Sequence, residues 1–451
     1  MDVRIIVETT FENGTTKTHH LGRLSRPFRQ AQPEEIGLLL EDARTMLAQL
    51  QNAILLDQIE EISEASRICP DCAKIRAIHD YRPRVLDTLF GRFRVMAPRI
   101  RRCACNAKSE TIPGGPLSPL ANLFPHRSTP ELQRLPAELG ARPSFREAAR
   151  ILETFLPCAR QLNTTVRNRL GKIAQDISGC DQAVPALVQD ATSPPLTVFL
   201  DGAHIRCRPE YPRRHLDVVV GKIESPNMCR RFGLAQQATV SPAKQLRQDL
   251  HALGWDGKRS VTVISDGEPA LPNLVLSAVR QPVRHILDWW HISMRVQHIE
   301  NAVKGLLQTE NFPGIPELFK RPAETLRWYL WHGKIQTVGT LVQCLMVDCA
   351  RLSKDDPAVR DATARVQARC RELYSYLANN MDNLTNHGWR HRNGLPISSS
   401  RAEGCVDDIG NTRMGKRRRM RWSPKGAHSV AVTRAAVLDG RLTVSCRKIA
   451  A

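Results

Sequence analysis

The sequence predicts an α/β protein in which a sheet carries acidic residues at its strand ends and a large all-helical segment is inserted after the last strand. Two apolar runs, residues 197–200 and 260–265, read as buried strands because they are short and rich in bulky and β-branched residues. Each run ends in an Asp-Gly pair, at Asp201 and Asp266. From about residue 295 to 393 the pattern is helical, without evident strands.

The two carboxylates predict a metal site. Two strands that deliver an Asp at the same end place like charges side by side, and such an arrangement needs a divalent cation. Mg²⁺ held by carboxylates is typical of enzymes that catalyse phosphoryl transfer. We expect the Gly after each Asp to end its strand; a plain turn is the alternative meaning of each Asp-Gly pair.

Length and composition limit the possible classes of protein. The 451 residues suffice for about three domains, and the hydrophobic content of 42% allows a globular core. No apolar run reaches about 18 residues, and the N-terminus lacks the apolar stretch of a signal peptide, so a cytoplasmic protein without membrane contact is expected. The 13 cysteines are then thiols or metal ligands.

The charge predicts a polyanionic partner. The formal net charge is +20 and the isoelectric point is near 9.8. Nucleic acid is the first candidate, because no amphipathic basic helix or lipidation motif points to a membrane.

The first 66 residues are expected to be a strand at 3–9 and a long amphipathic helix over 33–63. This helix either packs on its own domain or dimerises as a coiled coil. Residues 67–125 are expected to be a zinc ribbon, because two cysteine pairs bracket a hairpin at 88–95. The pairs, which would hold one tetrahedral Zn²⁺ or remain free thiols, are Cys69, Cys72, Cys103 and Cys105.

A Pro-rich linker is expected at 113–125, followed by three short helices over 126–180. Thr129 caps the first, which Gly140 ends; Ser144 opens the second with a capping box, and Asn163 caps the third. Short helices with tight turns are typical of a helix-turn-helix domain, and a structural bundle is the alternative. The expected DNA contacts on the third helix are Arg167, Arg169 and Lys172.

The central region, residues 181–297, begins with a linker at 181–195 and continues in the order β-β-β-α-β-α-β-α. That order is typical of a ribonuclease-H-like core, whose metal carboxylates lie on the first and fourth strands, where Asp201 and Asp266 fall. The helical insertion follows at 298–396. Residues 397–451 hold a short helix with Glu403 and a basic run with an embedded aromatic residue, which suits a nucleic-acid backbone, although a solvated charged surface has the same composition. The run contains Lys416, Arg417, Arg418, Arg419 and Arg421.

Several of these motifs together resemble the DDE transposases of bacterial insertion sequences, in particular the Kra-type family. The similar stretches are residues 200–202, 265–267, 285–295, 328–333 and 413–424. The resemblance implies a ribonuclease-H-like core in which Asp201, Asp266 and Glu403 hold two Mg²⁺ ions, or Mn²⁺ in their place. It also implies that Asp288 and His291 form an auxiliary motif.

The resemblance implies a transposase that cuts and joins DNA at the ends of a mobile element, acts as a homo-oligomer on double-stranded element and target DNA, and is found at the bacterial nucleoid. A nuclease or resolvase on the same core, or a non-catalytic DNA-binding regulator, are the alternatives. Spacing alone leaves the third carboxylate open. The other candidates are Glu268, Glu300, Glu310, Asp407 and Asp408.

Overall fold

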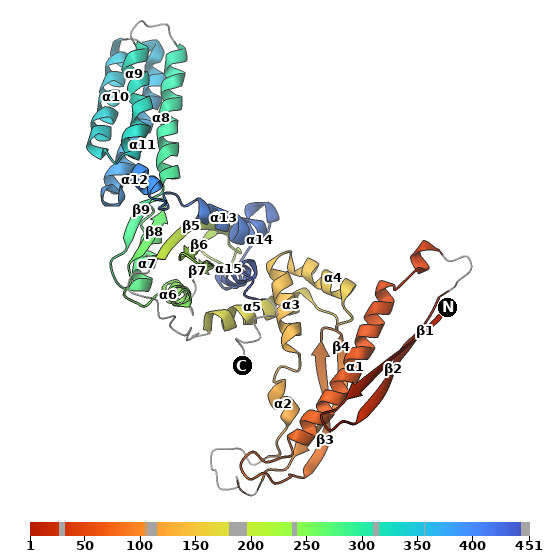
Figure 1. Ribbon diagram of the computed structural model, residues 1–451. Coiled ribbons are helices and arrows are strands. Elements are labelled where there is room, and N and C mark those ends of the chain that lie inside the picture. Colours follow the sequence, from red (N-terminus) through yellow and green to blue (C-terminus); the bar gives the residue numbers. More distant parts are fainter. Residues whose placement is uncertain are drawn as a thin grey trace. The chain divides into compact units, whose positions relative to one another are not determined.

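A computed structural model describes residues 1–26, 32–103, 105, 115–179, 196–236, 241–309, 315–355 and 357–442 (Figure 1). These residues form two compact units, Met1–Ala174 and Gln175–Ala451. The linker expected at 181–195 lies outside the described residues. Among the described helices, none combines the length and apolar composition needed to cross a membrane.

The first unit begins with an antiparallel pair of strands, β1 (Asp2–Thr10) and β2 (Thr16–Ser25), followed by α1 (Leu40–Ala65). The helix starts later than residue 33, where it was expected. A separate 3₁₀ turn, η1 (Pro33–Glu35), precedes it, and Gly37 then takes a φ of +83°, which a continuing helix does not allow.

A long hairpin follows, made of β3 (Ile78–Thr88) and β4 (Gly91–Ile100). The expected hairpin at 88–95 contains its turn but only a fraction of its length. Leu55 and Ile59 of α1 share a hydrophobic cluster with Leu86 and Val95 of the hairpin. The helix therefore packs against the hairpin, and the boundary expected between residues 66 and 67 falls inside one core.

Helices complete the first unit. A short helix, α2 (Pro119–Leu123), occupies the Pro-rich stretch that was expected to be a linker; Leu120 is buried there and joins the hairpin cluster, which explains the helix. Three helices follow in the expected order: α3 (Pro130–Ala141), α4 (Phe145–Phe155) and α5 (Asn163–Gly179). Ser144 Oγ accepts a hydrogen bond from the Glu147 amide at 3.1 Å, as a capping residue should.

The second unit is built on a five-stranded mixed sheet in the order β7-β6-β5-β8-β9. Strands β5, β8 and β9 run parallel, whereas β6 and β7 are antiparallel to their neighbours. The strands are β5 (Leu196–Arg206), β6 (His215–Glu224), β7 (Cys229–Ala235), β8 (Val261–Ser265) and β9 (Arg284–Leu287). Helices α6 (Pro242–Ala252) and α7 (Ala270–Val279) share a core with one face.

One expectation about β5 is wrong: the strand does not end at Asp201. Its parallel pairing with β8 stops at Phe199, but its antiparallel pairing with β6 continues as far as Arg206. The partner strand β6 therefore holds Asp201 and Gly202 in extended conformation. Gly202 has a negative φ and open space around it, so nothing in the backbone requires a turn there.

The other face of the sheet is covered by the C-terminal part of the chain. Helix α13 (Ser400–Cys405) leads into a π-helical turn, η5 (Val406–Asn411), and the short α14 (Thr412–Met414). A last helix, α15 (Pro424–Leu438), is buried along most of its length and packs on β7 and β6, with Ala431 close against Gly233. The basic C-terminal region expected to hold DNA is therefore partly a core element, because residues 427–437 of α15 are buried.

All described elements between β9 and α13 are helical, as expected. Four long helices contact one another around a single hydrophobic cluster and stand side by side as a bundle (Figure 1). They are α8 (Trp289–Thr309), α9 (Ile315–Trp331), α10 (Ile335–Asp355) and α11 (Arg360–Asn379), followed by the short α12 (His387–Arg392).

Candidate metal centre

Three aspartates come to the same level of the sheet. Phe199 on β5 pairs with Ile264 on β8, which pairs with Ile286 on β9. Two residues further along each of these three segments stand Asp201, Asp266 and Asp288. Asp266 and Asp288 lie one residue beyond the ends of β8 and β9, but the Asp288 amide still donates to the Ser265 carbonyl at 3.0 Å, so the pairing extends to this level. Because residues i and i+2 of an extended chain point to the same face, this register directs the three carboxylates to one face of the sheet.

That face is the one covered by α13. Phe199, Ile264 and Ile286 form a small buried cluster with Ala402 of α13. The next residue of the helix is Glu403. This apolar cluster therefore holds α13 in place, and α13 carries the fourth carboxylate, that of Glu403.

Asp288 is fully buried and accepts three hydrogen bonds. Its Oδ1 accepts from the Trp290 amide at 2.8 Å, and its Oδ2 accepts from Ser399 Oγ at 2.5 Å and from His291 Nδ1 at 2.9 Å. Burial raises the pKa of a carboxyl, but here the three donors outweigh it and hold the pKa of Asp288 below its usual value. Asp288 is therefore an anion whose oxygens are largely used by protein donors.

His291, in the first turn of α8, contacts Asp288 and is close enough to Asp266 and Asp201 to respond to their charges. Its hydrogen bond to Asp288 is the largest reason that the pKa of His291 is raised. Ligand atoms of Asp288, His291 and Glu403 all lie within 4.8 Å of one another, a spacing that could hold a metal ion.

Asp201 and Glu403 carry unfavourable negative charge in this arrangement. Burial is the main cause that raises the pKa of Asp201, and the Asp266 and Asp288 carboxylates add to it. Burial also raises the pKa of Glu403, with further contributions from Asp288 and Asp201. The charge of His291 lowers both pKa values but does not outweigh these effects, and a bound cation would offset the remaining cost in free energy.

A cation also fits the unsatisfied groups of the site. Glu403 Oε1 is buried and has no hydrogen-bond partner among the described residues. A buried carboxylate oxygen without a donor is costly, and a metal ion is the partner that the neighbouring carboxylates favour. Asp201 is near enough to this group for the charges of His291 and Asp288 to shift its pKa.

The two Asp-Gly pairs of the site differ. Gly267 has a φ of +93°, and an added Cβ would lie 2.9 Å from Leu287 Cδ2, so Asp266 is followed by a turn that strongly favours Gly. Asp266 Oδ1 accepts from the Glu268 amide at 3.0 Å and helps to close this turn.

The other candidates for the third carboxylate are placed elsewhere or engaged otherwise. Asp407 and Asp408 are exposed, and Asp407 Oδ1 accepts from Asn411 Nδ2 at 2.8 Å. Glu300 pairs with Arg327 on α9 at 3.2 Å. Glu268 is exposed, and Glu310 lies outside the described residues. Glu403 is the candidate that packs beside Asp288 and His291.

Two residues that support the site were missed by the sequence analysis. Ser399 donates to Asp288, and Tyr376 on α11 donates its hydroxyl to the Asp266 carbonyl at 2.8 Å. Ser399 stands in a run of three serines just before Glu403, which is a weak signal. Nothing in the sequence around Tyr376 indicates a position beside Asp266, 110 residues earlier.

The four cysteines form a second candidate metal site, in the first unit. Their Sγ atoms all lie within 4.8 Å of one another. The Cys69 and Cys105 sulfurs are 3.6 Å apart, and the Cys72 and Cys103 sulfurs are 3.4 Å apart. A tetrahedral zinc with bonds of about 2.3 Å separates its sulfur ligands by roughly 3.8 Å, so the set could bind zinc.

The expected DNA-contacting residues have different environments. Arg167 is exposed, whereas Arg169 is half-buried and donates to the Leu132 carbonyl of α3 at 2.6 Å, so it supports the helices. Lys172 is half-buried. The basic run exposes Arg417, Arg418, Arg419 and Arg421, and the side chain of Lys416 lies outside the described part of the chain.

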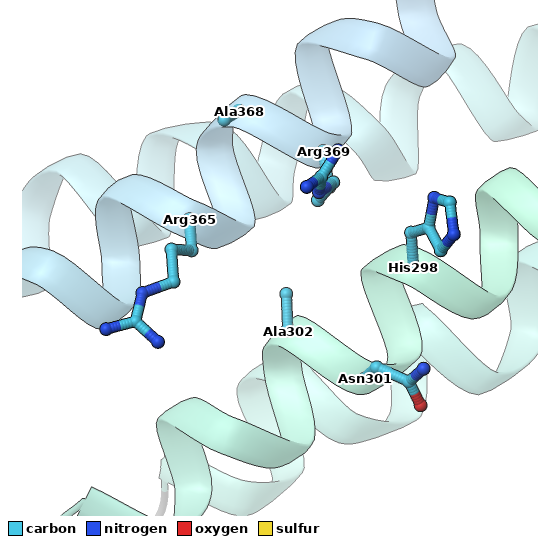
Figure 2. Close-up of a pocket in the computed structure, with 6 residues that line it drawn as sticks. All are labelled: His298, Asn301, Ala302, Arg365, Ala368 and Arg369. Atoms are coloured by element: carbon cyan, nitrogen blue, oxygen red, sulfur yellow. The ribbon is translucent and has the colours of Figure 1, made fainter.

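A surface hollow of about 350 Å³ lies away from the metal centre, between α8 and α11 (Figure 2). Its polar lining includes His298, Arg365 and Arg369, all exposed, and Arg369 is also paired with Glu372 at 2.8 Å. None of the site residues lines this hollow. The candidate centre is a cluster of acidic groups beneath α13 and differs from this hollow in place and in charge.

No protein-family model matches this chain, and no curated protein matches it either.

Proposed function

We propose that this chain is a metal-dependent DNA transposase with a ribonuclease-H-like core, and that Asp201, Asp266 and Glu403 are its metal-binding carboxylates. The observation that carries the proposal is the register of the sheet, which brings three Asp residues to one face, together with the packing of Glu403 against that face. The strand order β7-β6-β5-β8-β9, with β5 between an antiparallel and a parallel neighbour, also supports a core of this type.

The roles of the residues follow from their surroundings. Asp201 and Glu403 have raised pKa values, and Glu403 Oε1 has no donor among the described residues, so these oxygens are suited to Mg²⁺. Bound Mg²⁺ supplies a Lewis acid and charge neutralisation for in-line displacement at phosphorus. Asp288, whose oxygens already accept three hydrogen bonds, orients His291 and the start of α8.

Double-stranded DNA is the proposed substrate and partner. The net charge of +20 supports a polyanion, and the cysteine cluster with helices α3 to α5 is proposed as a zinc ribbon and helix-turn-helix that bind the element ends. No nucleophilic Ser or Tyr is needed, because water and then a DNA 3′-hydroxyl serve as nucleophiles.

The test is incubation of the full chain with DNA carrying the ends of the element that encodes it, plus Mg²⁺. Strand cleavage followed by joining to a target is expected, and Glu403→Gln should abolish both while sparing DNA binding. Asp407→Asn is the matched control and should react normally. Cleavage without joining would make the protein a nuclease, and binding without cleavage a regulator; normal cleavage by Glu403→Gln would remove Glu403 from the site.

A further inference from the structure

The connection between β5 and β6 presents a group of basic residues that the sequence analysis did not single out. Four arginines at or near this turn are exposed: Arg206, Arg208, Arg213 and Arg214. Glu210 is the acidic residue of the turn and pairs with Arg208 at 3.7 Å. The turn therefore has an excess of positive charge, and it directly follows the strand that carries Asp201.

The C-terminal basic run is attached to this turn by its backbone. The Trp422 amide donates to the Arg206 carbonyl at 2.9 Å, and the Arg208 amide donates to the Trp422 carbonyl at 3.1 Å. Residue 422 thus continues the sheet pairing beyond the end of β5, as a parallel bridge to Cys207. The run at 417–421 consequently ends beside the β5–β6 turn, because Arg421 directly precedes the attached Trp422.

The attachment is fixed by a buried aromatic ring. Trp422 is 5% exposed, and the guanidinium of Arg413 lies over its ring at 5.0 Å. Arg413 is itself buried, so it packs the tryptophan and does not belong to the exposed charge. The arginines of the run remain on the surface while Trp422 holds the segment in place.

We propose that the β5–β6 turn and residues 417–421 form one phosphate-binding surface for the backbone of duplex DNA that extends from the metal centre. The inference rests on the proposed function and states where the DNA backbone would leave the metal centre. Seven exposed arginines contribute: Arg208, Arg213, Arg214, Arg417, Arg418, Arg419 and Arg421. A duplex is the favoured partner because the arginines far outnumber the exposed aromatic residue of the turn, Tyr211, and guanidinium groups suit phosphates more than bases.

The distance to the metal centre fits this path. Arg206, where the turn begins, is five residues beyond Asp201 on one continuous strand, which corresponds to roughly 17 Å. Side chains alternate along a strand, so the Arg206 side chain lies on the face opposite to Asp201, and the phosphate contacts come from the residues after it. Phosphates of one DNA strand recur at about 3.4 Å along the helix axis. The surface would therefore meet the backbone about five nucleotides from the phosphate at the metal centre.

The test measures duplex binding by the full chain, in Ca²⁺ without Mg²⁺, as a function of salt. Each phosphate contact contributes about 0.9 to the slope of log affinity against log salt. Arg213→Gln with Arg214→Gln should reduce this slope by about 2, Arg417→Gln with Arg419→Gln should do the same, and all four together should reduce it by about 4. Two exposed cations of α10, changed as Arg351→Gln with Lys354→Gln, are the matched control and should leave the slope unchanged.

Trp422→Ala tests the attachment, since it removes no charge and should still weaken binding if the ring positions the run. The arginine pairs decide the outcome if this variant does not fold. Unchanged slopes in both pairs, in a protein that cuts DNA, would overturn the surface and leave the proposed function intact. An equal loss in the α10 control would show that net charge alone is measured, which also overturns it. Failure to bind duplex at low salt would instead overturn the proposed function.

Discussion

Ser399 donates a hydrogen bond to Asp288 across 111 positions of the sequence, with 2.5 Å between Ser399 Oγ and Asp288 Oδ2. Ser399 is the N-cap residue of α13, yet its hydroxyl makes no capping hydrogen bond. The side chain that would cap the helix instead connects it to the end of β9. This hydrogen bond holds the start of α13, and with it Glu403, against the sheet. The helical bundle inserted between Asp288 and Ser399 is not needed to set the position of Glu403.

Ser399→Ala should weaken this connection. A buried hydrogen bond to a charged group is worth about 2 kcal/mol, and Asp288 would lose one of its three donors. We expect the free energy of unfolding to fall by about that amount and DNA cleavage to slow, with duplex binding unchanged. Urea denaturation and a cleavage time course measure the two effects.

Ser400→Ala is the matched control, because Ser400 is exposed and its side chain has no role in holding Asp288. If Ser399→Ala cut DNA as fast as the control variant, the connection between α13 and β9 would not matter for the position of Glu403.

Much of the sheet was predictable because its strands are short apolar runs and its Asp residues stand at fixed points of the pattern. The sequence analysis expected Asp201 and Asp266 side by side, but the pairing of Phe199, Ile264 and Ile286 that sets their level in the sheet could not be read from the chain. Local propensity also misplaced the end of β5, where pairing with β6 overrides the Asp-Gly signal.

The C-terminal region was the least predictable part. Charge dominates its composition, so the apolar stretch of α15 was read as part of a basic tail. Burial is decided by the partner surface: Gly233 and Ala431 allow α15 to lie close against β7. Likewise, Arg413 counts as a basic residue in the sequence but lies buried over Trp422 in the fold.

Asp288 should support the metal centre without being its main ligand. Its carboxylate already accepts from Trp290, Ser399 and His291, so Asp288→Ala should lower the rate of DNA cleavage less than Asp201→Ala does. Titration of the two variants with Mn²⁺ separates the roles. Asp201→Ala should lose most of its metal affinity and Asp288→Ala should retain it. An equal loss of affinity in both would make Asp288 a ligand.

The cysteine cluster should hold about one zinc ion per chain, by the four-ligand rule. Cys69→Ser with Cys72→Ser should remove the metal and lower the melting temperature of the first unit, because the ion joins the start of the hairpin to its end. Elemental analysis and a thermal scan test this. Cys344→Ser, an exposed cysteine of α10, is the control. Unchanged zinc content in the double variant would rule out the cluster as its ligand set.

His428 should make the stability of the second unit depend on pH. The side chain is buried in α15; its Nδ1 accepts a hydrogen bond from the Ala235 amide of β7 at 3.3 Å, and its Nε2 is buried without a partner among the described residues. Burial lowers the pKa of His428 to about 4. An acceptor at Nδ1 and a desolvated ring both require the neutral form.

Because the pKa of His428 is lower in the folded chain than in the unfolded chain, the unfolded state binds the proton more readily between the two values. The stabilisation is therefore complete above the unfolded pKa of about 6.5 and is lost as the pH falls towards the folded value. From about pH 7 to about pH 5, His428 should remove about 2 kcal/mol from the free energy of unfolding.

His428→Gln should be less stable than the natural chain near neutrality and should lose less stability on acidification, as measured by urea denaturation at both pH values. His298→Gln, at an exposed position of α8, should keep the natural pH dependence; if His428→Gln kept it too, the protonation of His428 would not be what destabilises the fold in acid.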